Sequence, residues 1–175
     1  MEHSDHVALL RDGVPGPGGV WADLGSGAGA FTLALADLLG PDAEIYSVDT
    51  DPRALARQAE AMRERFPATR VHYLAADFTG PLTLPPLDGI VMANALHFQR
   101  DQAAVVRGLR ERLRPGGRLL LVEYNTDRGN HWVPYPLTYP TWAVLARACG
   151  FADTRLLHTR PSRFLGKIYS AVSVA

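Results

Sequence analysis

Residues 20–29 read Val-Trp-Ala-Asp-Leu-Gly-Ser-Gly-Ala-Gly, and this stretch decides the fold. It opens with an apolar run of strand length, Val20–Leu24, that carries an acid, Asp23, near its end. Glycines follow on alternate positions: Gly25, Gly27 and Gly29. Because glycine has no side chain, main-chain N–H groups at such a turn can approach a ligand closely. The stretch therefore predicts a strand, a turn and a helix that together bind a nucleotide-like cofactor.

The rest of the chain alternates apolar runs of strand length with helix-like stretches, which is the pattern of a parallel sheet covered by helices on both faces. The expected strands are 20–24, 44–48, 71–75, 89–93 and 118–124, and the expected helices are 28–39, 52–66 and 101–113. The connection after the third strand contains Pro81, Pro85 and Pro86, so we expect mostly loop there. These elements predict an open, doubly wound α/β sheet.

The end of the chain departs from the alternation of strands and helices. A helix at 140–150 is followed by two strands that a short segment connects. The strands are expected at 153–158 and 164–174. A parallel pair needs a crossover of about a dozen residues or more, so these two strands must be antiparallel if they are neighbours.

We expect the 175 residues to form one domain. Its parts are a short N-terminal segment (1–19), a cofactor-binding core (20–125) and a substrate-side region (126–175). Residues 5–11 are a candidate amphipathic helix, which is either a packed terminal turn or a lid over the cofactor.

The composition gives no reason to expect a polyanionic partner. Lys plus Arg and Asp plus Glu both number 18, so there is no net attraction to nucleic acid or to an anionic membrane. Cys149 is the only cysteine, so we expect no disulfide within the chain and no metal site. Residues 1–6 lack the basic and apolar order of an export signal, and no apolar run approaches the roughly 20 residues of a membrane span. We therefore expect a cytoplasmic protein that is not inserted in a membrane.

Acidic residues stand at the ends of three successive predicted strands: Asp23, Asp49 and Asp77. Because parallel strands end at one edge of a sheet, these carboxylates are expected in one crevice. Asp49 can accept hydrogen bonds from both hydroxyls of a ribose, each typically worth about 1.5–3 kcal/mol. Asp77 is placed to meet an adenine amine, and the alternative is that it only caps a turn. Asp23 favours a ligand with a cationic part, such as an ammonium group.

Five segments of the chain resemble the class I S-adenosylmethionine-dependent methyltransferases: 23–29, 45–49, 76–78, 87–98 and 113–119. The resemblance implies a Rossmann-like sheet of seven strands with an antiparallel last strand, and S-adenosylmethionine as cofactor. Carried over position by position, it implies the following cofactor-binding residues: Asp23, Gly25, Ser26, Gly27, Gly29, Asp49, Thr50, Asp77, Phe78 and Asn94. Two alternatives stay open, an NAD(P)-dependent oxidoreductase, which leaves Asp23 without a role, and a methyltransferase-like subunit that binds without catalysing.

The sequence indicates less clearly which molecule accepts the methyl group. If it is a hydroxyl or an acidic carbon, a base must take its proton, and His97, just beyond the fourth strand, is the predicted base. The alternative is that this histidine packs against or caps the next helix. Residues 94–97, Asn-Ala-Leu-His, depart from the Asn/Asp-Pro-Pro-Tyr/Phe motif of relatives that modify nucleobases or glutamine, which favours methyl transfer to an O, C or N atom of a small-molecule acceptor.

The predicted substrate wall consists of Tyr124, His131, Trp132, Tyr135 and Arg163. Aromatic side chains of this wall can stack on a planar acceptor. The alternatives are that the aromatic residues pack a long loop and that Arg163 is a solvated hairpin charge. A homodimer that covers this open face is a further expectation.

Overall fold

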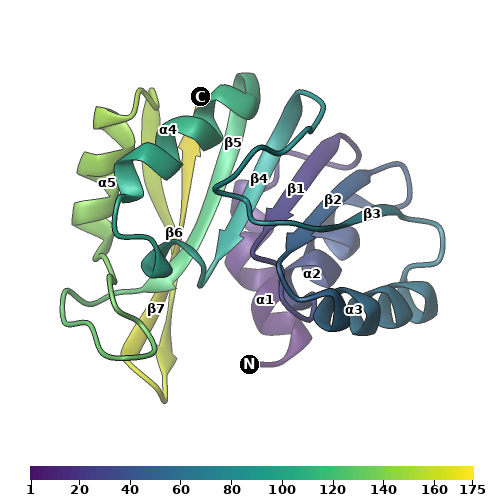
Figure 1. Cartoon of the computed structure of the whole chain (residues 1–175), viewed down its shortest axis with the longest axis horizontal. Helices are drawn as coiled ribbons and strands as arrows, with labels where there is room; N and C mark the ends of the chain where they lie inside the picture. Colours follow the sequence, from purple (N-terminus) through teal and green to yellow (C-terminus); the bar gives the residue numbers. More distant parts are fainter.

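The computed structural model describes all 175 residues and contains a seven-stranded sheet with the order β3-β2-β1-β4-β5-β7-β6 (Figure 1). The strands are β1 (Val20–Leu24), β2 (Glu44–Asp49), β3 (Arg70–Ala75), β4 (Leu87–Ala93), β5 (Leu113–Tyr124), β6 (Asp153–Ser162) and β7 (Gly166–Val174). Strands β1 to β5 run parallel to one another, and β7 is antiparallel to both of its neighbours, β5 and β6. The predicted mostly parallel sheet with an antiparallel last strand is confirmed.

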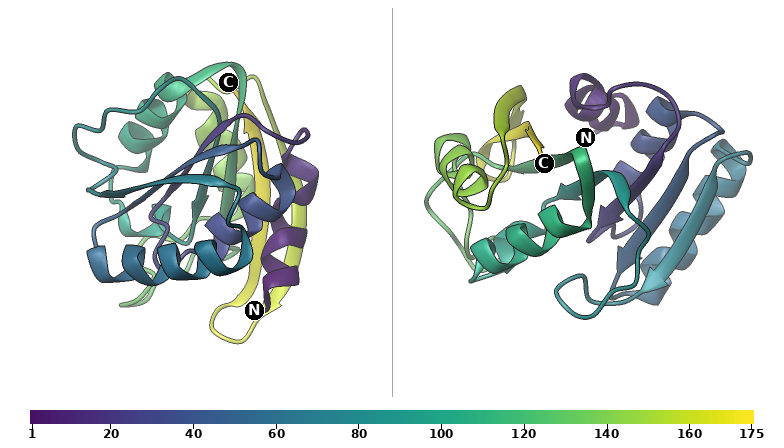
Figure 2. Two further views of the ribbon diagram at one scale, coloured as in Figure 1. Left: turned by 90° about the vertical axis from the view of Figure 1, so that its right-hand side faces the viewer. Right: turned by 90° about the horizontal axis from the view of Figure 1, so that it is seen from above.

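Helices cover both faces of this sheet (Figure 2). They are α1 (His3–Leu10), α2 (Ala30–Leu39), α3 (Pro52–Arg65), α4 (Gln102–Arg112) and α5 (Tyr139–Ala148). Buried residues of α1, α2 and α3 form one apolar cluster with one face of the sheet, and those of α4 and α5 form a second cluster with the other face. The strands of the centre are therefore apolar on both sides, as continuous apolar runs predict.

Short-range hydrogen bonds fix where the helices begin. The Asp51 carboxylate accepts from the main-chain N–H of Arg53, and Pro52 occupies the first turn of α3. Asp101 caps α4 in the same way through the N–H of Ala104. Helix α2 begins two residues later than expected, because Gly29 has a φ of 88° and lies outside the helix as its cap.

One end of the sheet, at β6, differs from expectation in detail. Strand β6 extends to Ser162, so the turn before β7 is shorter than predicted and Arg160 lies inside the strand. Arg160 forms an ion pair with Asp5 of α1. Residues 76–86, between β3 and β4, contain no helix, as their prolines predict.

Helix α1 packs on the molecule as part of the core. Its residues Val7, Leu9 and Leu10 are buried in the same cluster as α2. Just after the helix, the carboxylate of Asp12 lies 3.0 Å from Nε2 of His158 on β6. No helix in the structure combines the length and the hydrophobicity that a membrane crossing requires.

Candidate cofactor and acceptor site

The glycine turn is held against the neighbouring strand by main-chain hydrogen bonds. The N–H groups of Gly25 and Ser26 both donate to the carbonyl of Val48, at 2.9 and 3.1 Å. Gly25 has a φ of 77°, and a Cβ built on it would lie 2.6 Å from the Cβ of Ala95. A larger residue at this position therefore collides with the segment after β4.

The two carboxylates nearest the turn are both hydrogen-bonded. Oδ2 of Asp23 accepts from the hydroxyl of Thr32 at 2.6 Å, and the residue is only 1% exposed. Burial raises the pKa of the Asp23 carboxyl to about 7, and the charge of Asp49 acts in the same direction. Asp49 accepts from the N–H of Gly27 at 2.7 Å with one oxygen and from the N–H of Asp51 at 2.9 Å with the other.

Asp77, the third acid, is exposed in a turn. Its Oδ1 accepts from the hydroxyl of Thr79 at 2.7 Å and from the N–H of the same residue at 2.8 Å. These hydrogen bonds lower the pKa of the Asp77 carboxyl, so the group is ionised near neutral pH. The turn-capping role is thus present, and it leaves the second carboxylate oxygen free.

A cavity of about 280 Å³ lies at the carboxyl-terminal edge of the strands. Its lining residues are Gly25, Asp49, Thr50, Asp77, Phe78, Asn94, Ala95, Phe98 and Gln99. The other predicted cofactor residues, Asp23, Ser26, Gly27 and Gly29, belong to the adjoining strand and turn and do not line the cavity. Ala95, Phe98 and Gln99 were not predicted, although their position just after β4, close to Asn94 and His97, was a usable signal.

Two larger cavities, about 460 and 450 Å³, lie at the opposite edge of the sheet. There Asp88 accepts from the N–H of Val20 at 2.8 Å and pairs with Arg114 at 2.6 Å. Asp88 thus has a structural role. Neither cavity contains the strand-end acids, so the smaller cavity is the one that the chemistry selects.

Asn94 has an unusual backbone conformation and an unpaired side-chain oxygen. It is the only non-glycine residue with a positive φ, at 52°. Its N–H donates to the carbonyl of Val122 at 2.8 Å, whereas its side-chain Oδ1 is buried without any hydrogen-bond partner. Because an unpaired buried acceptor is costly, this oxygen fits a ligand that brings a donor, such as an ammonium group.

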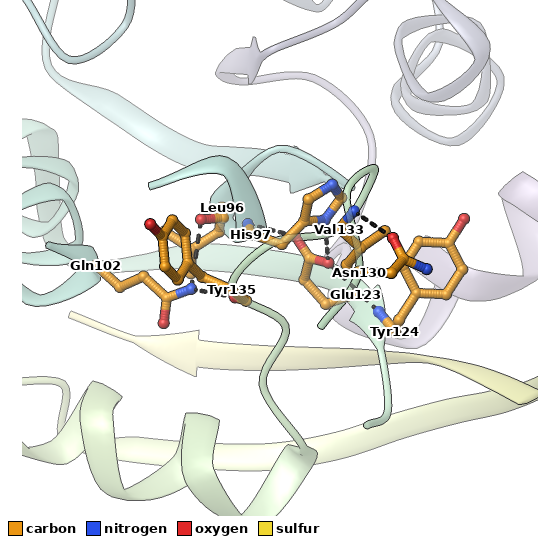
Figure 3. A network of polar contacts seen from close by, with 8 residues as sticks. All are labelled: Leu96, His97, Gln102, Glu123, Tyr124, Asn130, Val133 and Tyr135. Atoms are coloured by element: carbon orange, nitrogen blue, oxygen red, sulfur yellow. Dashed lines mark hydrogen bonds and ion pairs between the residues drawn. The ribbon is translucent and has the colours of Figure 1, made fainter. Parts of the chain in front are cut away.

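His97 and Glu123 form a buried pair beside the cavity (Figure 3). Nδ1 of His97 lies 2.8 Å from Oε2 of Glu123, and the main-chain N–H of His97 donates to Oε1 at 3.2 Å. The two residues are 2% and 0% exposed. Since Nδ1 faces the carboxylate, Nε2 is the ring nitrogen left for another partner. Glu123 lies 26 positions after His97 in the sequence, and only the register of β4 and β5 brings the two residues together.

Aromatic rings surround this pair. The ring centroids of Phe98 and Tyr124 lie 4.3 and 6.1 Å from that of His97. Phe164, in the turn between β6 and β7, stands 5.8 Å from Tyr124 and was not predicted. The N–H of Tyr135 donates to the carbonyl of His97 at 3.0 Å, which ties the loop after β5 to the site.

The rest of the predicted substrate wall is exposed. Trp132 is 70% exposed and Tyr135 is 43% exposed, while His131 and Arg163 are exposed as well. The loop itself is ordered by Asn130, whose Oδ1 accepts from the N–H groups of Trp132 and Val133. None of these residues lines the 280 Å³ cavity.

Comparison with known proteins gives a consistent result. The family model described as "Methyltransferase domain" matches residues 22–119. Carboxy-S-adenosyl-L-methionine synthase of Chromohalobacter salexigens is 33% identical over 144 residues, which cover 79% of this chain and 51% of that protein. Acetylserotonin O-methyltransferase of Mus musculus is 40% identical over 114 residues, covering 59% and 28%.

The structure of the YcgJ protein from Bacillus subtilis has the same fold, with a TM-score of 0.79, 15% identity and 98% coverage of both chains. The chain spans about half the length of its C. salexigens relative and less than a third of the length of its mouse relative. The family match covers the end of β1, the glycine turn and the three strand-end acids. The chain therefore belongs to the methyltransferase domain family, within the class I methyltransferases whose cofactor is S-adenosylmethionine.

Proposed function

We propose that this chain transfers a methyl group from S-adenosylmethionine to a small-molecule acceptor that gives up a proton as it is methylated. The observation that carries the proposal is the buried His97–Glu123 pair at the ends of β4 and β5. Ala95 and Phe98, which flank His97, line the cavity of the glycine turn. A potential base thus stands directly beside the candidate cofactor site.

Residues of the cavity have the chemistry to hold each part of the cofactor. Asp49 would accept from the ribose hydroxyls, and Asp77 with Phe78 would contact the adenine. Asn94 offers its unpaired Oδ1 to the ammonium group, and the negative charge of Asp23 attracts the same cationic part when the carboxyl is ionised. When bound, S-adenosylmethionine supplies a methyl group on a positively charged sulfur, which is a good leaving group.

Glu123 prepares His97 to act as a base. A carboxylate that accepts from Nδ1–H fixes the tautomer in which Nε2 carries a lone pair. The same carboxylate stabilises the positive charge that the ring acquires when Nε2 takes a proton, because the pair is shielded from water. The pair therefore favours an acceptor whose oxygen or acidic carbon must lose a proton.

The surrounding rings favour a flat, apolar acceptor. The rings of Phe98 and Tyr124 lie near that of His97, and Trp132 and Tyr135 stand on the adjoining loop. Exposed aromatic rings of this kind bind planar molecules by stacking. The mouse relative is named as an O-methyltransferase, which agrees with an oxygen acceptor.

A binding experiment and a labelling experiment test the proposal. Titration with S-adenosylhomocysteine should saturate the protein, while NADH should not bind. Incubation with S-adenosylmethionine labelled on the methyl group and a metabolite extract should then place the label in a small molecule.

The His72→Gln variant serves as the matched control for a His97→Gln variant in the labelling assay, because His72 lies on β3 outside the site. Label found in protein or RNA would contradict the acceptor class. Binding of S-adenosylhomocysteine without formation of any labelled product would favour the non-catalytic alternative.

A further inference from the structure

A cluster of three polar side chains joins the glycine turn to its neighbours, and two of its members, on β2 and α3, have no part in the function described so far. It consists of Ser26 in the turn, Ser47 on β2 and Gln58 on α3. The Ser47 hydroxyl lies 2.7 Å from that of Ser26 and 3.0 Å from Oε1 of Gln58, and the Ser26 hydroxyl lies 3.4 Å from the same Oε1. The cluster thus connects the turn to a strand and a helix that follow it in the sequence.

The burial of Gln58 is energetically unfavourable. Its side chain is 0% exposed, yet Nε2 has no hydrogen-bond partner. An unpaired buried amide opposes folding, so an apolar side chain of similar size would fill the same space at lower cost. Core packing therefore does not account for a glutamine here, and its contacts to the turn are what distinguish it from a leucine.

Gln58 also contacts the far end of the same turn. A Cβ built on Gly29 would lie 2.3 Å from Cγ and 2.6 Å from Cδ of Gln58. Only a glycine at position 29 leaves room for this side chain. Gln58 therefore holds the turn at two points, by polar contact at Ser26 and by close packing at Gly29.

The position of the turn matters for Asp49. Ser47 and Asp49 are two residues apart on β2, so their side chains point to the same face of the strand. Between the two points held by Gln58, the N–H of Gly27 donates to Asp49 at 2.7 Å. A turn released from Ser47 would move relative to the acid that the proposed function assigns to the ribose.

We propose that Gln58 is a positioning residue that, through Ser47 and Ser26, holds the glycine turn in the conformation that binds S-adenosylmethionine. The inference rests on the proposed function only in that the turn binds this cofactor. It predicts that Gln58 sets the affinity for the cofactor and contributes little to the chemical step or to stability.

The test uses Gln58→Leu, which keeps the volume, and Ser47→Ala, which removes one hydroxyl. Ser173→Ala is the matched control, because Ser173 is equally buried and its hydroxyl lies 2.9 Å from that of Thr154, on the other side of the sheet. Calorimetric titration with S-adenosylhomocysteine gives the Kd, and thermal unfolding gives the Tm. We expect both cluster variants to raise the Kd about tenfold and the control to leave it within about twofold.

Two further readouts separate positioning from simple packing. The Tm of Gln58→Leu should equal or exceed that of the parent protein, and the Ser47→Ala and Gln58→Leu effects on the Kd should not add in the double variant. The amide NMR signal of Gly27 in the ligand-free protein should shift in Gln58→Leu and not in Ser173→Ala. This signal reports on the turn even if the parent protein binds no S-adenosylhomocysteine, a result that would refute the proposed function instead.

An unchanged Kd in Gln58→Leu, or an equal loss in Ser173→Ala, would overturn the inference. An unmoved Gly27 amide would do the same.

Discussion

The two halves of the site are built in opposite ways. On the cofactor half, the three strand-end acids all accept hydrogen bonds from nearby protein groups: Asp23 from Thr32, Asp49 from Gly27 and Asp77 from Thr79. On the acceptor half, large rings face solvent, and Trp132, Tyr135 and Phe164 are 70%, 43% and 51% exposed. The first half is ordered before any ligand arrives, whereas the second presents apolar surface that gains stability only when a ligand covers it.

This difference implies different responses to mutation. Changes on the cofactor half break hydrogen bonds that already exist, so they should weaken binding of the cofactor strongly. Changes to the exposed rings remove contacts that exist only with an acceptor, so they should leave the free protein unchanged. The one exception on the acceptor half is the buried His97–Glu123 pair.

That exception gives the largest expected effect. His97→Gln keeps an N–H donor for Glu123 but removes the basic nitrogen, so we expect kcat to fall by about 10²- to 10⁴-fold. The Kd for S-adenosylhomocysteine should stay within about twofold, because the cofactor half is intact. Rates with the acceptor found in the labelling assay measure this. Retained turnover would mean that the pair is structural and that both halves serve binding alone.

Asp49→Ala should give the next largest effect. It removes a charged acceptor for the ribose and leaves the N–H groups of Gly27 and Asp51 without their partner, so we expect the Kd for S-adenosylhomocysteine to rise about 10- to 100-fold. Isothermal titration measures the change. Asp42→Ala, an exposed acid after α2, is the control and should bind as the parent protein does. Equal affinity in both variants would remove Asp49 from the site.

The pH dependence of binding gives a smaller effect that reports on Asp23. Burial raises the pKa of this carboxyl to about 7, so the group is largely neutral at pH 6 and ionised at pH 8. The ammonium group of a bound ligand favours the ionised carboxyl, so we expect S-adenosylhomocysteine to bind several-fold more tightly at pH 8 than at pH 6. The Asp23→Asn variant should show a flatter profile. An equally steep profile in that variant would assign the effect to another group.

The same carboxyl affects stability with the opposite sign. Its pKa in the folded protein lies above the ordinary value of 3.8, so the folded state holds the proton more tightly than the unfolded state. The contribution of Asp23 to stability is therefore greatest below about pH 4 and is lost as the pH rises through 7. As the pH rises across this range, the Tm of the parent protein should fall relative to that of Asp23→Asn, because asparagine does not titrate.

Mutation of an exposed ring should give the smallest effect on catalysis. It tests directly whether the acceptor half, unlike the cofactor half, acts only when a ligand is bound. Trp132→Ala should raise the KM for the acceptor a few-fold, by loss of a stacking contact of about 1 kcal/mol, with an unchanged Tm. Val144→Ala, at a residue 71% exposed on α5, is the control for loss of exposed apolar surface. A lower Tm in Trp132→Ala would show that the loop uses this ring for packing.

The sequence predicted the cofactor half better than the acceptor half, and the physical reason is the range of the interactions. The glycine turn and the acid at each strand end are local patterns, so Asp49 and Asp77 could be placed at one edge from the order of the strands alone, whereas Asn94 was predicted from the resemblance to the methyltransferase family. The partner of His97 could not, because Glu123 lies on another strand and meets it only through the register of β4 and β5.

Gln58 and Phe164 were missed for the same reason. Gln58 looks like an ordinary polar residue of an amphipathic helix until the fold places it against Gly29. Phe164 looks like part of a strand, yet β6 runs four residues further than expected and leaves it in the turn, beside Tyr124. Long-range contacts of this kind are fixed by packing and register, which periodicity does not reveal.

The antiparallel course of β7 has a practical consequence. Its first residues pair with the end of β5, at Tyr124, and its last residues pair with Arg118, so the strand travels from the acceptor edge back to the opposite edge. With nine residues at about 3.3 Å each, it places Ala175 roughly 30 Å from the β6–β7 turn. A surface tether or fluorescent reporter joined at Ala175 would therefore leave the acceptor edge unobstructed, whereas one inserted beside Phe164 would sit directly over it.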